Sequence, residues 1–249
     1  MIQDLHSHTY YSFCGKDSPE TIVEAAINGG IELFGICDHN SGINFGNYQA
    51  FNAPSNIIPD EYNELAFRKY FEHMSLIKEK YSPKIKVLVG VEVTAHLNIP
   101  KIAIQDGADL SYFDYCLIEN PDMENSIIKK DLFSFAEKLK CKNSGVAHTD
   151  MFKFIKSLGE DPYKYFKKMA KENIFWEMNL SYDSIHNYRE HEYVKEFFDS
   201  KEQQQIIRES GVKLSVGFDG HRVEDYLPDR VADFCRRITD MGIKLAFEK

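Results

Sequence analysis

Short apolar runs alternate with longer amphipathic runs along almost the whole chain, and this alternation constrains the fold more than any other feature. The apolar runs have the length of strands, as in "ELFGICDH" (residues 32–39) and "IKVLVGVEV" (residues 85–93). The amphipathic runs carry apolar residues at helical spacing, as in "DEYNELAFRKYFEHMSLIKEKY" (residues 60–81). Regular alternation of this kind predicts a parallel sheet with the helices packed outside it.

The predicted strands lie near residues 2–6, 32–39, 85–93, 113–118, 144–148, 174–179 and 212–219. The predicted helices lie near residues 18–30, 60–81, 127–140, 161–172, 191–211 and 231–242. The polar stretch at residues 41–59 is expected to form a loop after the second strand. Seven or eight β–α units across 249 residues favour a closed barrel, and a doubly wound open sheet is the alternative. We therefore expect one α/β domain over residues 1–249.

The charge balance bears on the class of partner. The chain has 30 basic and 39 acidic residues, a formal net charge of −9. An acidic surface argues against broad binding to nucleic acid or to an anionic membrane. A phosphate-bearing partner would therefore need a local positive centre, such as a metal ion.

The five cysteines, an odd number without a CxxC pair, suggest reduced thiols in a cytoplasmic protein. The N-terminus lacks the basic and apolar segments of a signal peptide, and no apolar run approaches the length of a membrane span. The sequence carries no signal for an oligomeric state.

Residue types that bind metals recur at the ends of the predicted strands. His6 and His8 stand one residue apart on the first strand, so both imidazoles face the same side of the sheet. Five of the seven strands deliver such residues: His6 and His8, Asp38 and His39, Glu92, His148, and Asp219 and His221. The C-terminal ends of barrel strands open on one face, so these side chains are expected to converge there.

Each of these residues alone is more often a satisfied polar side chain, a salt-bridged carboxylate or part of a turn. Their recurrence at one kind of position points instead to metal binding. Nitrogen and oxygen ligands without a thiolate cluster suit catalytic Zn, Mn or Fe. The set is too large for one ion, so we expect two or three divalent ions, with Glu92 able to bridge a pair. Paired ions about 4 Å apart can clamp a phosphoryl group and activate water.

Five motifs in this order, "HSH", "CDHN", "GVEVT", "AHTD" and "FDGH", resemble those of the polymerase and histidinol phosphatase (PHP) family. The resemblance runs from Asp4 to about His221, and "YFEHMSLIKEKYSPKIKVLVGVEV" is similar to the histidinol-phosphatase branch. It implies a distorted (β/α)7 barrel, a trinuclear metal site and phosphoester hydrolysis.

The resemblance also assigns roles to individual residues. It gives metal-binding roles to His6, His8, His39, His148, Asp219 and His221, and a bridging role to Glu92. It makes Asp38 a partner that supports His39 from behind.

Two positions differ from the family's pattern. Family members often have a His or Asp shortly after the first motif, where this chain reads "YSFCGKD". Cys14 or Asp17 could serve there; Asp17 suits a hard metal better, although capping of the next helix explains it equally well. Family members often have a His after the fourth strand, where this chain reads "CLIENPD", and Glu119 could replace it as an oxygen ligand.

The resemblance implies a metal-dependent phosphoesterase with a small phosphorylated substrate. The expected reaction is in-line attack on phosphorus by hydroxide formed from metal-bound water. Glu92, His148 and Asp219 are expected in the catalytic machinery. Arg222 is expected to clamp phosphate, because its planar guanidinium suits phosphate oxygens.

Several alternatives stay open at this point. Asn179 is a weaker candidate for orienting a ligand, and Tyr10 and Tyr11 could line the pocket mouth. Histidinol phosphate, a nucleotide, a sugar phosphate and a phosphodiester all remain candidate substrates, and a metal-binding module with a regulatory or scaffold role is the non-enzymatic alternative. The amidohydrolase superfamily also begins with a paired-histidine strand, but it resembles the chain less, because it is expected to carry a lysine near a middle strand.

Overall fold

Seven parallel strands form one sheet, in chain order from β1 to β7, in the computed structural model of the chain. The structure describes residues 1–43, 60–95, 109–124, 126, 128 and 131–248. The strands are β1 (Gln3–Asp4), β2 (Leu33–His39), β3 (Lys86–Thr94), β4 (Tyr115–Glu119), β5 (Ser144–Val146), β6 (Ile174–Asn179) and β7 (Leu214–Gly217). Each strand pairs with its neighbour in the chain, so every connection carries the chain one strand onward.

The sheet closes where the first strand meets the last. The amide of Leu5 donates to the carbonyl of Val216 at 2.8 Å, and the amide of Asp219 donates to the carbonyl of His6 at 2.8 Å. β1 itself is only two residues long, so the closing hydrogen bonds come mostly from the irregular segment after it. The predicted distorted (β/α)7 barrel is therefore confirmed, and the doubly wound alternative is wrong.

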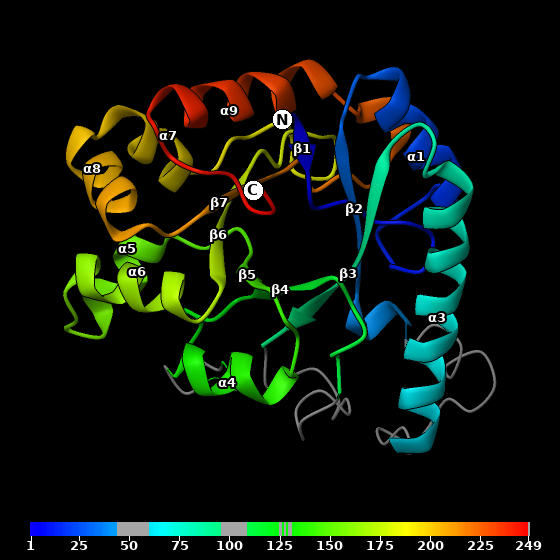
Figure 1. Cartoon of the computed structure of the whole chain (residues 1–249), viewed down its shortest axis with the longest axis horizontal. Coiled ribbons are helices and arrows are strands. Elements are labelled where there is room, and N and C mark those ends of the chain that lie inside the picture. Colours follow the sequence, from blue (N-terminus) through cyan, green and yellow to red (C-terminus); the bar gives the residue numbers. More distant parts are fainter. Residues whose placement is uncertain (44–59, 96–108, 125, 127, 129–130, 249) are drawn as a thin grey trace.

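Helices lie around the outside of the ring of strands (Figure 1). They are α1 (Pro19–Asn28), α3 (Asp60–Tyr81), α4 (Leu132–Leu139), α5 (Met151–Ser157), α6 (Pro162–Lys171), α7 (Glu192–Asp199), α8 (Lys201–Ser210), η2 (Val223–Asp225) and α9 (Pro228–Asp240). Among the described residues, no helix is both long and apolar enough to cross a membrane.

Two predictions of helices need correction. The run at residues 191–211 was expected to be one helix, but it forms α7 and α8. Ser200 separates them in an extended conformation, and its hydroxyl accepts a hydrogen bond from the amide of Gln203 as an N-cap. The short helix α5 was not predicted; Asp150 caps it through the amide of Lys153.

Two other boundaries differ from the prediction. In the expected loop at 41–59, residues 41–43 are helical, and residues 44–59 lie outside the described part of the chain. The helix expected from residue 127 begins at Leu132, because the side chain of Asp131 accepts from the amide of Ser134 and caps the first turn. Residues 127, 129 and 130 are not described.

The barrel interior is filled below its mouth. Tyr115 is fully buried there, and its hydroxyl donates to the carbonyl of Leu5 at 2.7 Å. Side chains at Gly35 and Gly90 would overlap the Tyr115 ring, so both strands need glycine at these positions. Because the ring closes the interior, the space left for polar chemistry lies at the C-terminal ends of the strands.

Candidate metal centre

The strand ends bring the predicted metal-binding residues to one place. His39 ends β2, and strand register places it beside Glu92 of β3. Glu119 ends β4, and His148 follows β5 by two residues. The remaining members come from the segments after β1 and β7: His6, His8, Asp219 and His221.

Glu92 lies at the centre of this group. Its carboxylate is fully buried. Its Oε2 atom lies 2.8 Å from Nδ1 of His39, 3.3 Å from Nε2 of His6 and 3.6 Å from Nε2 of His8. Its Oε1 atom lies 3.1 Å from Nε2 of His148. Burial opposes ionisation of Glu92, but the neighbouring imidazoles, His39 first among them, hold its pKa well below the usual range.

Asp219 adds a second carboxylate beside the same histidines. Its Oδ1 atom lies 3.0 Å from Nε2 of His8, 3.6 Å from Nε2 of His6 and 3.7 Å from Nε2 of His221. Asp219 has a φ of 60° and His148 a φ of 22°, which non-glycine residues adopt at a cost of about 1–3 kcal/mol. Such backbone strain is typical of functional sites, and here it aims both side chains into the cluster.

The donor set fits a divalent cation. In the described part of the chain, the buried atoms His6 Nε2 and Glu92 Oε2 make no hydrogen bond, although they lie 3.3 Å apart. With metal–ligand bonds of about 2.1 Å, neighbouring ligands of a tetrahedral ion lie about 3.4 Å apart. The nitrogen–oxygen separations among His6, His8, Glu92 and Asp219 run from 3.0 to 3.6 Å, which matches that spacing.

The cluster extends beyond one ion. Among the described residues, five groups of three side chains bring ligand atoms within 4.8 Å of one another. They are His6–His8–Glu92, His39–Glu92–Glu119, His8–Asp219–His221, His8–Cys14–His39 and Asp183–His186–His221.

The model of the PHP domain family matches residues 4–241, which is nearly the whole chain. The chain belongs to the PHP family. The family prediction from the strand-end motifs is therefore confirmed. A comparison with curated proteins finds no match.

Two solved structures share this fold. A histidinol phosphate phosphatase from Lactococcus lactis, in complex with zinc, L-histidinol and phosphate, matches with a TM-score of 0.56 at 15% identity. The match covers 98% of this chain and 95% of that one. A Listeria monocytogenes protein assigned as a histidinol phosphatase matches with a TM-score of 0.50 at 17% identity, over 90% and 96% of the two chains. At these identities the likeness establishes the fold.

Glu119 lies in the same cluster of candidate metal ligands, at the end of β4. Its Oε2 atom lies 3.6 Å from Nε2 of His148, and its Oε1 atom lies 3.8 Å from Nδ1 of His39. The hydroxyl of Thr94 donates to the same carboxylate. Burial and the nearby Glu92 charge raise the pKa of Glu119 to about 7. A cation between these carboxylates would remove that repulsion, so the position suits an oxygen ligand.

Of the two residues that could follow the first motif as a ligand, Cys14 lies nearer the cluster than Asp17. Asp17 belongs to none of the five ligand groups among the described residues; its carboxylate accepts from the amide of Val223 at 2.8 Å. The predicted assignment of Asp17 to the metal centre therefore has no support from its placement. Cys14 reaches the cluster instead, beside His8 and His39. Burial raises the pKa of the Cys14 thiol, but hydrogen bonds with His221 and His39 lower it to about 7.

Glu177 supports the cluster and was not singled out in the sequence. Its Oε1 atom lies 2.8 Å from Nδ1 of His6, and its Oε2 atom accepts from the amide of His148 at 2.9 Å. Gly217 of β7 leaves room for it, since a Cβ there would overlap Glu177 Oε1 and the His6 side chain. A carboxylate behind a ligating imidazole fixes its orientation and raises its basicity. A charged residue inside the apolar run "IFWEMN" was the available signal.

Asp183 and His186 were also missed. Asp183 Oδ2 lies 3.0 Å from Nδ1 of His221, and Asp183 Oδ1 lies 2.7 Å from Nδ1 of His186. Hydrogen bonds with the two imidazoles outweigh burial and lower the pKa of Asp183. Nε2 of His186 lies 3.9 Å from Oδ2 of Asp219, and the ring is partly exposed. The two residues stand in an irregular segment, where periodicity gave no guide.

Asp38 was expected to support His39, but its hydrogen bonds go to the loop after His8. Its carboxylate accepts from the amide and hydroxyl of Thr9 at 2.7 and 2.8 Å, and from the hydroxyl of Ser12 at 2.7 Å. Ser12 Oγ in turn lies 3.2 Å from Nδ1 of His8 and accepts from the amide of His39 at 2.9 Å. Asp38 therefore holds the loop after His8 through Ser12.

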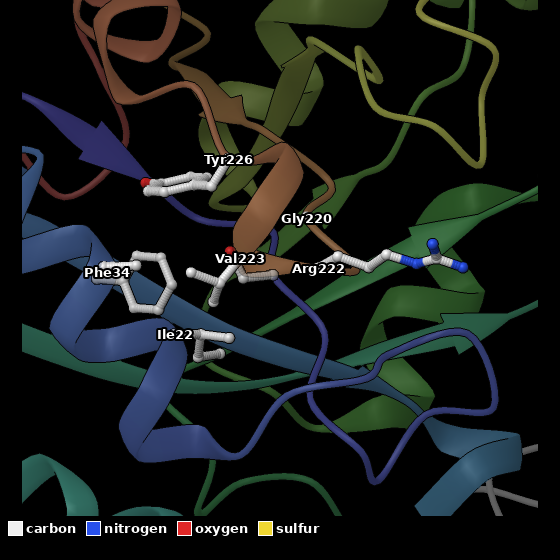
Figure 2. Close-up of a pocket in the computed structure, with 8 residues that line it drawn as sticks. Ile22, Phe34, Gly220, Arg222, Val223 and Tyr226 are labelled. Atoms are coloured by element: carbon white, nitrogen blue, oxygen red, sulfur yellow. The ribbon is translucent and has the colours of Figure 1, made fainter.

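Arg222, the expected phosphate clamp, points away from the apolar side chains of Ile22 and Phe34 (Figure 2). Its guanidinium lies 3.6 Å from the carboxylate of Glu224 and is partly exposed. A surface ion pair of this kind is weak, so phosphate could compete for the guanidinium. A phosphate-binding role stays a prediction.

Of the weaker candidates, Asn179 supports the cluster, whereas Tyr10 and Tyr11 lie nearer the surface. Asn179 donates from Nδ2 to Glu177 at 3.0 Å and to Asp219 at 3.3 Å, so it holds carboxylates of the cluster. Tyr10 is half exposed, and the hydroxyl of Tyr11 lies 3.0 Å from Nδ1 of His73. The pocket-lining roles of the two tyrosines remain predictions.

Proposed function

We propose that this chain is a metal-dependent phosphatase that hydrolyses a small phosphomonoester with two or three divalent ions. The proposal rests on the side chains that surround the Glu92 carboxylate. Four imidazole nitrogens from His6, His8, His39 and His148 lie within 3.6 Å of one fully buried carboxylate. Four imidazoles at one carboxylate exceed what protonation and hydrogen bonding require, whereas His6, His8, His39 and His148 would all be used if they held divalent ions.

Bound ions at this centre would neutralise phosphate oxygens and supply hydroxide near neutral pH. His6, His8, Glu92 and Asp219 would hold one ion, and His148 and Glu119 would hold a second across Glu92. Glu177 keeps Nδ1 of His6 engaged at 2.8 Å, so Nε2 is the atom left to hold an ion. The active centre is thus built from strand ends that the closed barrel fixes in place.

His186 is the proton donor that the site supports best. Its Nδ1 is engaged by Asp183 at 2.7 Å, which leaves Nε2 to carry a proton. That Nε2 atom lies 3.9 Å from Asp219 Oδ2, at a partly exposed ring. We infer that Nε2–H protonates the leaving alkoxide, and that Asp183 accepts from Nδ1–H and so orients the ring.

Histidinol phosphate is the first substrate to test. The Lactococcus lactis structure of the same fold binds zinc, L-histidinol and phosphate. The low identity leaves the leaving group of this chain to experiment, so nucleotide, sugar and diester phosphates belong in the same panel. The acidic surface, with a net charge of −9, favours a small anion drawn by the metal centre over a nucleic acid.

The test is phosphate release by protein purified without chelator and then supplied with Zn, Mn or Fe. We expect at least two ions per chain by elemental analysis, and metal-dependent hydrolysis of one or more phosphomonoesters. Less than one ion per chain, with no gain on reconstitution, would contradict the metal centre. Full metal content without turnover of any ester would favour the scaffold or regulatory alternative instead.

A further inference from the structure

The loop after His8 places a thiol against the metal centre. Cys14 Sγ forms a group with His8 and His39 in which the ligand atoms lie within 4.8 Å of one another. Cys14 thus shares one ligand group with two of the histidines that the proposed centre uses.

The loop is built to hold that position. The amide of Lys16 donates to the carbonyl of His221 at 3.0 Å, and the amide of Tyr10 donates to the carbonyl of Asp17 at 3.0 Å. A Cβ at Gly15 would overlap the carbonyl of Thr9, so the residue after Cys14 has to be glycine for the loop to fold back. These contacts fix the backbone on both sides of Cys14.

The same space also holds an unsatisfied buried carboxylate oxygen. Glu92 is fully buried, and its Oε2 atom makes no hydrogen bond within the described residues. That atom lies 2.8 Å from Nδ1 of His39, whose ring also belongs to the group with Cys14. His39 therefore links the bridging carboxylate to the thiol, and the donors form one continuous set.

We propose that Cys14 binds one cation of the centre as a thiolate, together with His39, whose ligand atom belongs to the same group. The inference rests on the proposed metal-dependent phosphatase. On binding, the Sγ–H proton leaves to solvent and a metal–sulfur bond forms, with no change in oxidation state. The carboxylate of Asp17 is engaged by the amide of Val223, so it does not compete for this position.

A sulfur ligand changes which ions the centre selects. Thiolate is a soft ligand that favours Zn²⁺, Co²⁺ and Cd²⁺, whereas Mn²⁺ and Mg²⁺ prefer oxygen. The centre would then have one thiophilic position beside positions made of nitrogen and oxygen. Replacement of Cys14 by Asp is expected to move that preference toward Mn²⁺.

The first experiment uses Co²⁺ as a spectroscopic probe on the full chain. Wild-type protein loaded with Co²⁺ is expected to show an intense thiolate-to-cobalt charge-transfer band in the near ultraviolet. Cys14→Ser should lose this band and bind about one ion fewer per chain, while keeping the weaker visible bands of the other ions. Cys141→Ser, a matched change at a partly buried cysteine outside the five ligand groups, should keep both.

A second measurement needs no variant. Iodoacetamide labelling followed by peptide mass spectrometry should modify Cys14 in metal-free protein. Zn²⁺ at about 100 times its Kd should slow that labelling roughly 100-fold, while the rate at Cys141 stays unchanged.

The outcomes separate the two proposals. Wild-type protein that binds at least two ions and hydrolyses phosphomonoesters, but shows no charge-transfer band and no protection of Cys14, overturns the thiolate ligand and leaves the phosphatase intact. Protein that binds no metal at all overturns both.

Discussion

At the scale of single residues, the site depends most on the two oxygen atoms of Glu92. Each faces imidazole nitrogens, with Oε2 near His39 and His6 and Oε1 near His148. A neutral group of the same shape would keep the packing and lose the charge that would offset the proposed ions. A substitution at Glu92 therefore distinguishes a metal-binding role from a structural one.

Glu92→Gln is expected to lower metal content by at least one ion per chain and phosphatase activity by about 100-fold or more, with the fold retained. Elemental analysis, phosphate release and circular dichroism would measure the three properties. Glu24→Gln is the matched control, because Glu24 on α1 accepts a hydrogen bond from Tyr81 far from the ligand groups. A Gln variant with full metal content and full activity would rule out the bridging role.

His186 carries the second prediction at this scale. His186→Asn removes the proposed donor at Nε2, which should slow hydrolysis of an alkyl phosphate by roughly 100-fold or more. Hydrolysis of 4-nitrophenyl phosphate should change far less, because its leaving group needs no proton. Equal losses on both esters would mean that His186 only positions the site, and His73→Asn on α3 serves as the control.

Sequence patterns predicted the candidate ligands at and just after the strand ends, because parallel topology brings the C-terminal ends of all the strands to one face. His6, His8, His39, Glu92 and Asp219 meet as these rules require. The same rules cannot place residues in loops. Cys14 and Asp17 stand three positions apart, and which of them reaches the site depends on how the loop folds back at Gly15, a property of backbone geometry.

At the scale of elements, the shortness of the strands determines how much room the site has for side chains. β7 has only four residues, yet it packs against β1 and β6 and leaves room for their polar side chains. The predicted strand at 212–219 ran longer than β7 because its apolar alternation continues into Phe218, while the backbone turns to a positive φ at Asp219. The break at Ser200 between α7 and α8 was missed for a similar reason, since periodicity continued across a residue that caps a new helix.

Gly217→Ala tests how closely β7 fits the site. The added methyl would overlap Glu177 Oε1 and the His6 side chain, so both should move. We expect a loss of metal affinity of about 10–100-fold with a modest loss of stability, because the displaced groups support a ligating imidazole. Metal titration and urea unfolding would measure the two effects. Ser215→Ala, on the same strand, is the control and should leave metal affinity unchanged.

At the scale of the whole molecule, a buried acidic side chain lies at the barrel seam, where the first strand meets the last. Asp4 of β1 is fully buried, and its Oδ1 atom accepts from the amides of Phe218 at 2.9 Å and His6 at 3.2 Å. These bonds join the start of the chain to the segment after β7. Burial raises the pKa of Asp4 from 3.8 to about 7, against the smaller opposing effect of the hydrogen bonds.

The raised pKa makes the stability of the closed barrel depend on pH. Between pH 3.8 and about 7 the folded protein keeps the Asp4 proton, while the unfolded chain has lost it. The folded state then binds more protons, so the contribution of this group to the free energy of unfolding falls as pH rises through that interval. It is fully present below pH 3.8 and is lost above about pH 7.

Asp4→Asn should remove this dependence, because the amide keeps Oδ1 as an acceptor and never ionises. The stability of the variant relative to wild type should therefore increase between about pH 5 and pH 8, by up to roughly 3 kcal/mol. Urea unfolding of metal-free protein at the two pH values measures the difference. Asp131→Asn is the control: hydrogen bonds with Ser134 lower the pKa of this helix cap, so its titration is complete below pH 5. A relative stability of Asp4→Asn that stays constant between the two pH values would mean that the seam holds Asp4 ionised throughout, with its charge balanced by the amides and by His6.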